Sequence, residues 1–460
     1  MHTAVIFSSE DTLEDYLFHE AERKAKGNIR QFGSRRVMIE GGGYNKIWLE
    51  TQPMGGEMYA KRDTEIALNN VLLFMEYAAD NGRMPGSIKY EGGKIIPEFN
   101  KFQGYCFPIH ALNLYYISKD MDYLQLLKKS LRAFDDYLWR YRDSDRDGLL
   151  ETWCIFDTGE DGTLRFGPDA PDYAIGETAP EGLSVLPAAS MDFMSYSYSS
   201  RDVLSRIAAI EGDGNEEKLW REKAEDVLRS MRASLWDAER SSYFDRDRNH
   251  KELGTLIHNT LRTMYWGSIV QDDADAFVHE HLLNTEEFWT RMPLPSIAIN
   301  DPLFRNIREN SWTGQAEALT YQRAIRALEN YEYDYLVPVL GRKLLSAIGM
   351  DGKFVQQYDP FTAEPSLVGE DEAYGPAILA VLEYIAHSHG VYIERDMAFW
   401  CNAEGSPSLY TQEWGDRSYR ISRNGRAAEC FLGGRKLFTL PEHSKAITDL
   451  DGNIIKLIYL

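Results

Sequence analysis

An aspartate and a pair of glutamines are the residues of this chain whose setting best suits proton-transfer chemistry. Asp161 lies in the segment DTGEDGTLRF (157–166), between two glycines and near Trp153 and Phe166. A lone aspartate in a loop is usually solvated. An aspartate that glycines and aromatic rings enclose loses water instead, which raises its pKa and suits it to act as a general acid.

The glutamine pair lies in the segment KFVQQYDPFTAEP (353–365), where a β-like run leads into a turn opened by Tyr358-Asp359-Pro360. Gln356 and Gln357 carry no obvious chemistry of their own. They become informative only if the rest of the chain indicates that a carboxylate belongs at this place.

Two other segments place polar residues at predicted helix starts. MGGEMYAKRDTEIAL (54–68) carries Arg62-Asp63, and NSWTGQAEAL (310–319) carries Trp312, Gln315 and Glu317. Acidic residues at a helix N-terminus are explained by capping and by the helix dipole. A helix start that faces a cavity presents the same carboxylates to a ligand, so a binding role is compatible with capping.

The segment YRDSDRDGLLETWC (141–154) resembles the first half of a calcium-binding EF-hand loop. Asp143, Asp145, Asp147 and Gly148 match its spacing, but Cys154 stands where a bidentate glutamate is needed. The sequence favours a capped, acidic turn that ends a helix, with a calcium site as the alternative.

Composition narrows the classes of partner. The net charge of −22 argues against nucleic acid and anionic membranes, both of which require a positive surface. The chain has 27 Tyr, 20 Phe and 10 Trp, and such residues either fill cores or line sites for sugars. The four cysteines are widely spaced, the N-terminus is too polar for a signal peptide, and no apolar run is long enough to span a bilayer. The cysteine spacing, the polar N-terminus and the lack of a long apolar run together predict a cytoplasmic protein.

Helical periodicity dominates residues 1–390. Short turns alternate with long loops rich in Gly, Pro and aromatic residues, such as 40–61, 82–104 and 147–189. This alternation predicts a toroid of inner and outer helices, because long loops at one end of a scaffold are where binding groups gather. A helical solenoid is the competing architecture, but no repeat of fixed period supports it. The predicted helices are 9–26, 62–81, 106–118, 120–141, 190–211, 215–236, 254–269, 272–284, 313–329, 331–348 and 374–388.

Residues 391–460 differ from the rest of the chain in their pattern of apolar and polar residues. Apolar and polar residues alternate around Asn424-Gly425, Gly433-Gly434 and Asp451-Gly452, which are hairpin signals. Nine basic and nine acidic residues balance in this segment, so the whole net charge lies on residues 1–390. We therefore predict a catalytic domain over 1–390 and a small C-terminal antiparallel β module over 391–460.

Taken in order, five motifs resemble the (α/α)6 catalytic domain of glycoside hydrolase family 63, which includes mannosylglycerate and glucosylglycerate hydrolases and processing α-glucosidases. The trehalases share the pattern more distantly. The resemblance covers residues 45–388. The motifs are the Gly-rich loop with Arg62-Asp63, DRDGL (145–149), DTGEDGTLRF (157–166), SWTGQAEA (311–318) and QQYDPFTAE (356–364).

The resemblance implies roles for individual residues. Asp161 matches the general acid of the family, and Asp63 with Arg62 matches a Trp-Asp pair that holds the sugar in the −1 subsite. The motif WRGP(I/V)W matches residues 312–317, although Thr, Gln and Glu replace its Arg, Pro and second Trp. The last motif, E-x-Y-(N/D)-P-x-T-G, carries the general base, and Gln356 stands at that position.

Gln356 keeps the shape of a glutamate but cannot accept a proton from water near neutral pH, so it should lower the rate by about 10²–10⁴-fold. Three explanations remain open. The chain is an engineered glutamate-to-glutamine variant, or another carboxylate such as Glu370 or Glu372 has taken over, or the protein binds sugar without cleaving it.

The sequence thus predicts an inverting, exo-acting hydrolase that releases a terminal α-linked hexose, glucose in the first instance, from a small glycoside or oligosaccharide. Alternatives are a non-catalytic glycan-binding relative and a trehalase-like enzyme with a relocated base. No metal or organic cofactor is required by this chemistry, and oligomeric state is left open. Beyond Asp161 and Gln356, the expected substrate-binding residues are Trp48, Arg62, Asp63, Gln103, Trp153, Trp312, Gln315, Glu317, Glu370, Glu372 and Tyr374.

Overall fold

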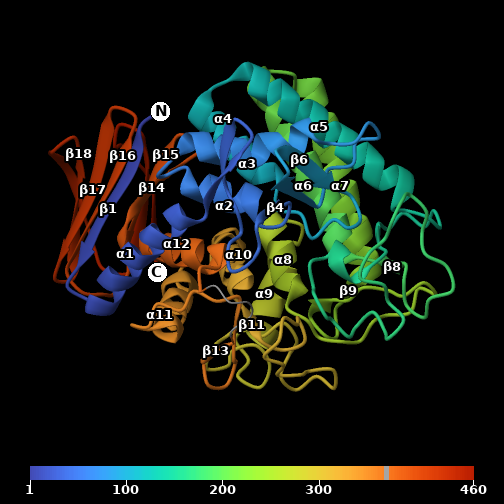
Figure 1. Cartoon of the computed structure of the whole chain (residues 1–460). Helices are drawn as coiled ribbons and strands as arrows, with labels where there is room; N and C mark the ends of the chain where they lie inside the picture. Colours follow the sequence, from blue (N-terminus) through green and yellow to red (C-terminus); the bar gives the residue numbers. More distant parts are fainter. Residues whose placement is uncertain (367–371) are drawn as a thin grey trace.

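A closed ring of six helices forms the centre of the molecule (Figure 1). The computed structural model describes residues 1–366 and 372–460, and twelve α-helices lie in these two stretches. Each inner helix contacts the next inner helix along the chain, and the last contacts the first, which closes the ring. The inner helices are α2 (Gln52–Tyr59), α4 (Pro108–Ser118), α6 (Met191–Glu211), α8 (Asn259–Trp266), α10 (Ala318–Glu329) and α12 (Gly375–His389).

Six outer helices alternate with the inner ones and cover the ring. In α5, residues Leu124, Leu127, Leu131, Phe134 and Leu138 recur every three or four positions and are all buried, which explains why this segment is an amphipathic helix. The outer helices are α1 (Thr12–Gly27), α3 (Thr64–Glu76), α5 (Met121–Tyr141), α7 (Gly214–Leu235), α9 (Gln271–Phe277) and α11 (Leu336–Ile348). The predicted toroid is confirmed.

Short strands stabilise the loops that link the helices. They pair in five small sheets: β2 with β3, β4 with β5 and β6, β7 with β8, β9 with β10, and β11 with β12 and β13. The strands of the toroid are β2 (Ile29–Phe32), β3 (Arg35–Met38), β4 (Lys46–Trp48), β5 (Ser87–Glu91), β6 (Lys94–Glu98), β7 (Glu151–Thr152), β8 (Ala188–Ala189), β9 (Trp236–Asp237), β10 (Ser242–Tyr243), β11 (Ala316–Glu317), β12 (Gln357–Tyr358) and β13 (Pro365–Ser366).

The C-terminal module consists of two antiparallel sheets, ordered β1-β16-β17-β18-β19 and β14-β15-β20-β21. Buried Trp400 of β15 packs against Tyr419 of β17 and Phe438 of β19, so the sheets share one core. The module comprises β14 (Val391–Glu394), β15 (Met397–Asn402), β16 (Ser408–Trp414), β17 (Arg417–Asn424), β18 (Ala427–Leu432), β19 (Arg435–Leu440), β20 (Ser444–Asp449) and β21 (Ile454–Tyr459).

The N-terminal strand β1 (Thr3–Ser9) belongs to this module, since it pairs along its whole length with β16. The helix predicted from residue 9 therefore begins only at Thr12. The predicted loop 40–61 contains inner helix α2, which the sequence did not indicate because two glycines and a proline lie within eight residues. Among the described residues, no helix is both long enough and apolar enough to cross a membrane.

Candidate active site

A cavity of about 190 Å³ lies where the loops preceding inner helices α2, α4, α6, α10 and α12 converge. Its walls combine carboxyl groups with aromatic rings. The lining residues are Glu40, Tyr44, Trp48, Glu50, Lys101, Gln103, Phe156, Gly159, Asp161, Tyr173, Trp312, Leu319, Gln356 and Tyr374. Of the sequence-predicted residues, Asp161, Gln356, Trp48, Gln103, Trp312 and Tyr374 are brought together here.

Two amide side chains hold the Asp161 carboxyl group in the cavity. Gln103 donates from Nε2 to Oδ1 at 3.2 Å, and Asn310 donates from Nδ2 to Oδ2 at 3.0 Å. Burial raises the pKa of Asp161, while the hydrogen bonds from Asn310 and Gln103 lower it. The net shift is upward, which is the direction that a general acid requires.

Buried ion pairs fix the loop that carries Asp161. Glu160 accepts a bond of 2.6 Å from Arg165, and Arg262 donates to the backbone oxygen of Thr158 at 2.8 Å. Although burial acts to raise it, the charges of Arg165 and Arg262 hold the pKa of Glu160 at about 2. Glu160 is therefore an anchoring carboxylate, and its neighbour Asp161 is the one that faces the cavity.

Gln356 lies across a short hydrogen-bonded bridge from Asp161. The Tyr44 hydroxyl donates to Gln356 Oε1 at 3.0 Å, and Gln356 Nε2 donates to Asn310 Oδ1 at 2.7 Å. Asn310 thus contacts both positions that the family motifs assign to acid and base. Gln357 points elsewhere and donates to the backbone oxygens of Ile307 and Glu309, which positions the Asn310 loop.

Aromatic rings and one lysine complete the walls. Lys101 Nζ lies 5.0 Å from the ring centre of Trp48 and 4.9 Å from that of Tyr173. Trp312 stacks over the Arg262 guanidinium at 5.0 Å and donates its backbone N–H to the Asp161 carbonyl oxygen at 2.7 Å. Flat rings beside hydrogen-bonding groups suit a ligand with apolar faces and a polar edge.

Six of the expected binding residues that the structure describes do not line the cavity: Arg62, Asp63, Trp153, Gln315, Glu317 and Glu372. Arg62 is buried in an ion pair with Glu22, and Asp63 caps outer helix α3 and pairs with Arg36 at 3.0 Å. Both follow the C-terminal end of α2, whereas the cavity lies at the N-terminal end of that helix.

Trp153 and Gln315 are buried beside the site rather than in it. Trp153 donates to Glu151 at 2.9 Å and stacks on Arg142 at 4.0 Å. Gln315 bonds Asn306 at 2.8 Å and accepts from Gln357 at 2.9 Å. These residues support the loops, because their polar atoms are used within the protein.

The remaining glutamates differ in position. Glu317 is fully buried behind the cavity wall, and burial together with the charges of Asp161 and Glu50 raises its pKa well above the usual value. Glu372 does not line the cavity, and its backbone oxygen accepts from Lys24 at 2.6 Å. Glu370 lies outside the described residues.

Sequence reasoning missed the lining residues Glu40, Tyr44, Glu50 and Lys101, as well as Asn310, which bonds Asp161. Four of these flank Trp48 or Gln103, which were predicted as binding residues. The Gly-rich run after Glu40 was the available signal, since it marks a loop that packs closely against other backbone.

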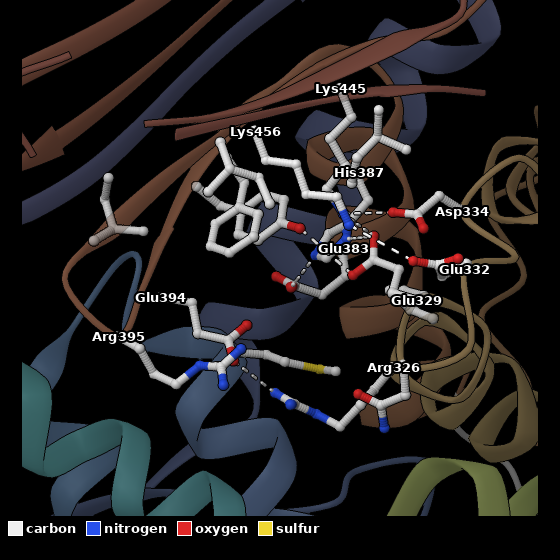
Figure 2. A pocket seen from close by; sticks show the side chains of 18 of the residues that line it. Arg326, Glu329, Glu332, Asp334, Glu383, His387, Glu394, Arg395, Lys445 and Lys456 are labelled. Atoms are coloured by element: carbon white, nitrogen blue, oxygen red, sulfur yellow. Dashed lines mark hydrogen bonds and ion pairs between the residues drawn. The ribbon is translucent and has the colours of Figure 1, made fainter. Parts of the chain in front are cut away.

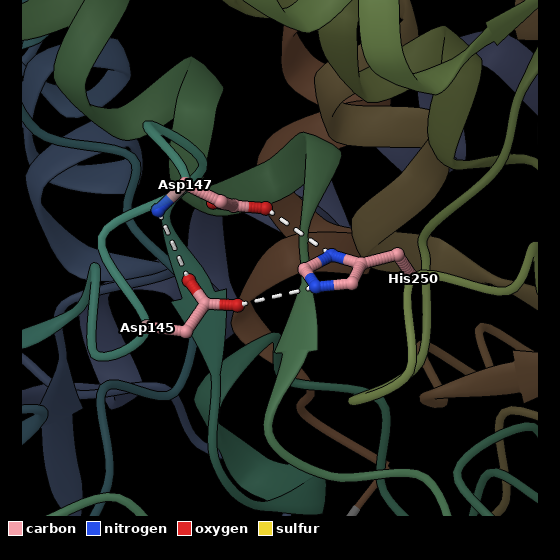
Figure 3. A group of neighbouring side chains, drawn as sticks. All are labelled: Asp145, Asp147 and His250. Carbon is pink, nitrogen blue, oxygen red and sulfur yellow. Dashed lines mark hydrogen bonds and ion pairs between the residues drawn. The ribbon is translucent and has the colours of Figure 1, made fainter.

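The acidic turn of residues 143–148 is clamped by a histidine (Figure 3). Asp147 Oδ1 accepts the Leu149 N–H at 2.8 Å, as expected of an Asx turn. Asp145 lies 3.7 Å from His250 Nε2, and Asp147 lies 3.3 Å from Nδ1. Opposite ring nitrogens face the two carboxylates, so the ring bridges them. One oxygen or nitrogen atom from each of the three side chains also lies within 4.8 Å of the others, so the turn is capped as predicted and the alternative of a metal site stays open.

A larger cavity of about 560 Å³ lies at the other end of the inner helices, against the β module (Figure 2). Its charged groups neutralise one another: Lys445 bonds Glu329 at 2.7 Å and Asp334 at 3.0 Å, and Lys61 bonds Glu383 at 2.6 Å. Against the effect of burial, His387 and Lys445 lower the pKa of Glu329, and Lys61 and His387 lower that of Glu383. Carboxylates held ionised cannot donate a proton, so the smaller cavity is the candidate active site.

An (α/α)6 toroid whose loops enclose a buried aspartate among aromatic rings has the arrangement that the family 63 resemblance predicts. The sequence profile described as the mannosylglycerate hydrolase MGH1-like glycoside hydrolase domain matches residues 59–375. The chain belongs to this family, which confirms the family 63 resemblance.

Solved structures share the fold at low sequence identity. The family 63 mannosylglycerate hydrolase from Thermus thermophilus, in complex with glucose, superposes with a TM-score of 0.65 and 18% identity, covering 80% of this chain and 99% of that one. Neutral trehalase Nth1 from Saccharomyces cerevisiae gives 0.58 and 15%, with 80% of each chain covered. A family 78 rhamnosidase from Bacillus sp. GL1 gives 0.62 and 12%, covering 94% of this chain and 40% of that one.

Proposed function

We propose that this glycoside hydrolase releases a terminal α-linked hexose, glucose in the first instance, from a small glycoside, with inversion at the anomeric carbon. The observation that carries the proposal is the Asp161 carboxyl group, which is buried in the cavity, held by two neutral amides and shifted toward protonation. It would protonate the leaving oxygen as the glycosidic bond breaks.

The size of the cavity supports release of a single sugar. A volume of about 190 Å³ is smaller than the roughly 300–1,000 Å³ of pockets that enclose drug-sized ligands. It leaves room for one sugar ring packed on Trp48 or Trp312, with the remainder of the substrate outside. This arrangement favours attack on a chain end.

Gln356 supports a second candidate, a glycan-binding protein without catalysis. Its amide is fixed by Tyr44 and Asn310 and cannot accept a proton near neutral pH. Both candidates use the same cavity, and measuring sugar release distinguishes them.

The test is reducing-sugar release from a panel of α-glucosides, trehalose and α-mannosides by the unmodified chain and by Asp161→Asn. We expect turnover of at least one α-glucoside, a loss of about 10²–10⁴-fold in the variant, and a product whose first-formed anomer is β by NMR. Saturable binding without turnover in either protein would replace the hydrolase proposal with the binding protein.

A further inference from the structure

Hydrolysis with inversion requires a second group, which takes a proton from the attacking water. The Gln356 amide cannot do so, and both of its polar atoms are already engaged by Tyr44 and Asn310. If the chain hydrolyses glycosides, another carboxylate must therefore lie across the sugar from Asp161.

Three carboxyl side chains line the cavity in the described part of the chain: Glu40, Glu50 and Asp161. Glu50 lies on the wall of the acid. A Cβ atom added to Gly159, two residues before Asp161, would lie 2.5 Å from Glu50 Oε1. Glu50 is also ion-paired with buried Arg323. Its position beneath the acid loop prevents it from serving the opposite face of the sugar.

Glu40 lines the cavity together with Tyr44, Tyr374 and Gln356. Its backbone oxygen accepts the Gly375 N–H at 2.6 Å, which ties it to the start of α12 beside Tyr374. The rings of Tyr374 and Tyr44 lie 6.4 Å apart, and Tyr44 in turn bonds Gln356. Glu40 therefore lines the same cavity as the residue that replaces the family base.

A tight turn at Gly41 sets the position of Glu40. Gly41 has φ +74°, and a Cβ atom there would overlap the Ala373 carbonyl oxygen and the Asn28 amide. Only glycine allows the chain to turn so tightly after β3 and bring Glu40 to the cavity. Among the described residues, no basic side chain forms an ion pair with the Glu40 carboxylate.

Glu317 is the strongest competitor, because both of its carboxylate oxygens are buried without a hydrogen-bond partner. Its side chain is 0% exposed and does not line the cavity, whereas that of Glu40 is 7% exposed and does. A base must contact the attacking water, and Glu317 would need the cavity wall to open first.

We propose that Glu40 is the general base of this enzyme, acting across the sugar from Asp161; this inference rests on the proposed function. Water attacks the anomeric carbon and gives a proton to Glu40. The glycosidic carbon–oxygen bond breaks, its electron pair stays on the leaving oxygen, and that oxygen takes the proton of Asp161. Solvent then returns the proton to Asp161 and removes the one on Glu40.

The electrostatic setting of Glu40 agrees with this role. Burial raises the pKa of Glu40, as do the charges of Glu50 and Asp161, whereas a hydrogen bond from Tyr374 lowers it. A more basic carboxylate accepts a proton more readily once it is ionised.

The experiment compares Glu40→Gln and Glu40→Ala with the unmodified chain on a substrate that it turns over. Glu40→Gln keeps the shape of the side chain, so we expect unchanged thermal unfolding and KM with kcat lower by about 10²–10⁴-fold. In Glu40→Ala, sodium azide should restore the rate and yield the β-glycosyl azide from an α-glycoside. Glu91→Gln, in an exposed hairpin, serves as the control and should keep full activity.

Two results would overturn the inference. One is Glu40→Gln activity within about threefold of the unmodified chain. The other is a folded Glu40→Ala protein that azide neither accelerates nor converts to a glycosyl azide. Loss of activity in Asp161→Asn alongside either result leaves the proposed function standing. Failure of the unmodified chain on the whole panel defeats the proposed function itself.

Discussion

Asn310 is the residue on which both ends of the site depend. Its amide donates to Asp161 at 3.0 Å and accepts from Gln356 at 2.7 Å. The loop that presents it is held by the side chain of Gln357, at 3.0 Å to Ile307 and 3.1 Å to Glu309. The two neighbouring glutamines therefore have separate tasks, one inside the cavity and one behind it.

We expect Asn310→Ala to shift the pH profile in a direction that a loss of folding cannot imitate. The Asn310 bond lowers the pKa of Asp161, so its removal raises that pKa further. The acid then stays protonated to higher pH, and the alkaline limb of kcat/KM moves upward. The loss of one bond to a charged group lowers kcat by about tenfold. An alkaline limb that stays in place would contradict this assignment; exposed Asn249→Ala provides the control.

At the level of single residues, the sequence predicted the cavity position of Asp161 better than that of its surroundings. Asp161 was identifiable because glycines, a tryptophan and a motif in one segment all mark it. Glu40 bonds Gly375, about 335 positions further along the chain. Asn310 bonds Asp161, about 150 positions earlier. No local pattern records which loops meet in space, so these residues could not be predicted.

Among the elements, the loop between β3 and β4 has the most demanding geometry. Gly41 exchanges two backbone hydrogen bonds with Tyr44, at 3.1 and 3.0 Å, while packing against Ala373 just before α12. Glu40 and Tyr44 are thereby presented from this loop, and Trp48 from the end of β4 that follows it. The loop and the first residues of α12 hold each other in place, because Gly41 packs against Ala373 and Glu40 bonds Gly375.

Gly41→Ala should therefore damage both stability and catalysis. A side chain at φ +74° costs about 1–2 kcal/mol from backbone strain alone, and the overlap with Ala373 adds to it. Gly92→Ala is the matched control, because Gly92 has φ +59° but nothing within 4 Å of the added Cβ. We expect a lower midpoint of denaturant unfolding and a lower kcat for Gly41→Ala than for Gly92→Ala. Equal effects in the two variants would show that close packing at Gly41 is unimportant.

Helices were predictable where their pattern was long. The 21 residues of α5 carry an apolar stripe and an Asp120 cap, and the prediction of 120–141 differs from the structure by one residue. The eight residues of α2 lack such a stripe, because an inner helix is surrounded by protein and buries nearly every side chain. Missing α2 also misplaced Arg62 and Asp63, since their distance from the cavity is the length of that helix.

For the whole molecule, the larger cavity explains how the β module is fastened to the toroid. Lys445 of β20 reaches Glu329 of α10 and Asp334, while His387 of α12 bonds Glu329 at 2.8 Å (Figure 2). Aromatic rings of the module add to the junction, as Tyr392 stacks on His387 at 3.9 Å. Buried charges here lie between the toroid and the β module, and Lys445 of the module is paired with carboxylates of the toroid.

Lys445→Met should loosen this junction without altering the chemistry. Removing one member of a buried ion pair leaves its partners uncompensated, which costs about 3–5 kcal/mol. The active-site cavity lies at the other end of the inner helices, so kcat at a temperature where the variant is folded should be unchanged. Lys456→Met removes an exposed pair with Glu332 at 3.7 Å and should cost at most about 1 kcal/mol. Denaturant unfolding measures both, and equal costs would argue against a structural role for Lys445.

The same junction should make the free energy of unfolding depend on pH in two ranges. Stability should fall as the pH decreases in the acidic range and fall as the pH increases in the range where His387 loses its proton. The pKa of Glu383 is held at about 2, below its usual 4.5, by Lys61 and His387, which outweigh burial. Its contribution is therefore present above pH 4.5 and lost as the pH falls toward 2. Although burial acts to lower the pKa of His387, Glu329 and Glu383 raise it above 6.5, so its contribution is present below pH 6.5 and lost as the pH rises through the raised value.

His387→Phe separates these ranges, because a phenyl ring can still stack on Tyr392 but cannot carry charge. We expect the variant to be less stable than the unmodified chain at about pH 6, with the difference shrinking as the pH rises toward about 9. Denaturant unfolding at several pH values gives the two curves. Curves that stay parallel would mean that His387 is neutral at the junction, so that Lys61 and Lys445 alone balance Glu329 and Glu383. Curves that converge would show that a protonated histidine helps to join the module to the ring.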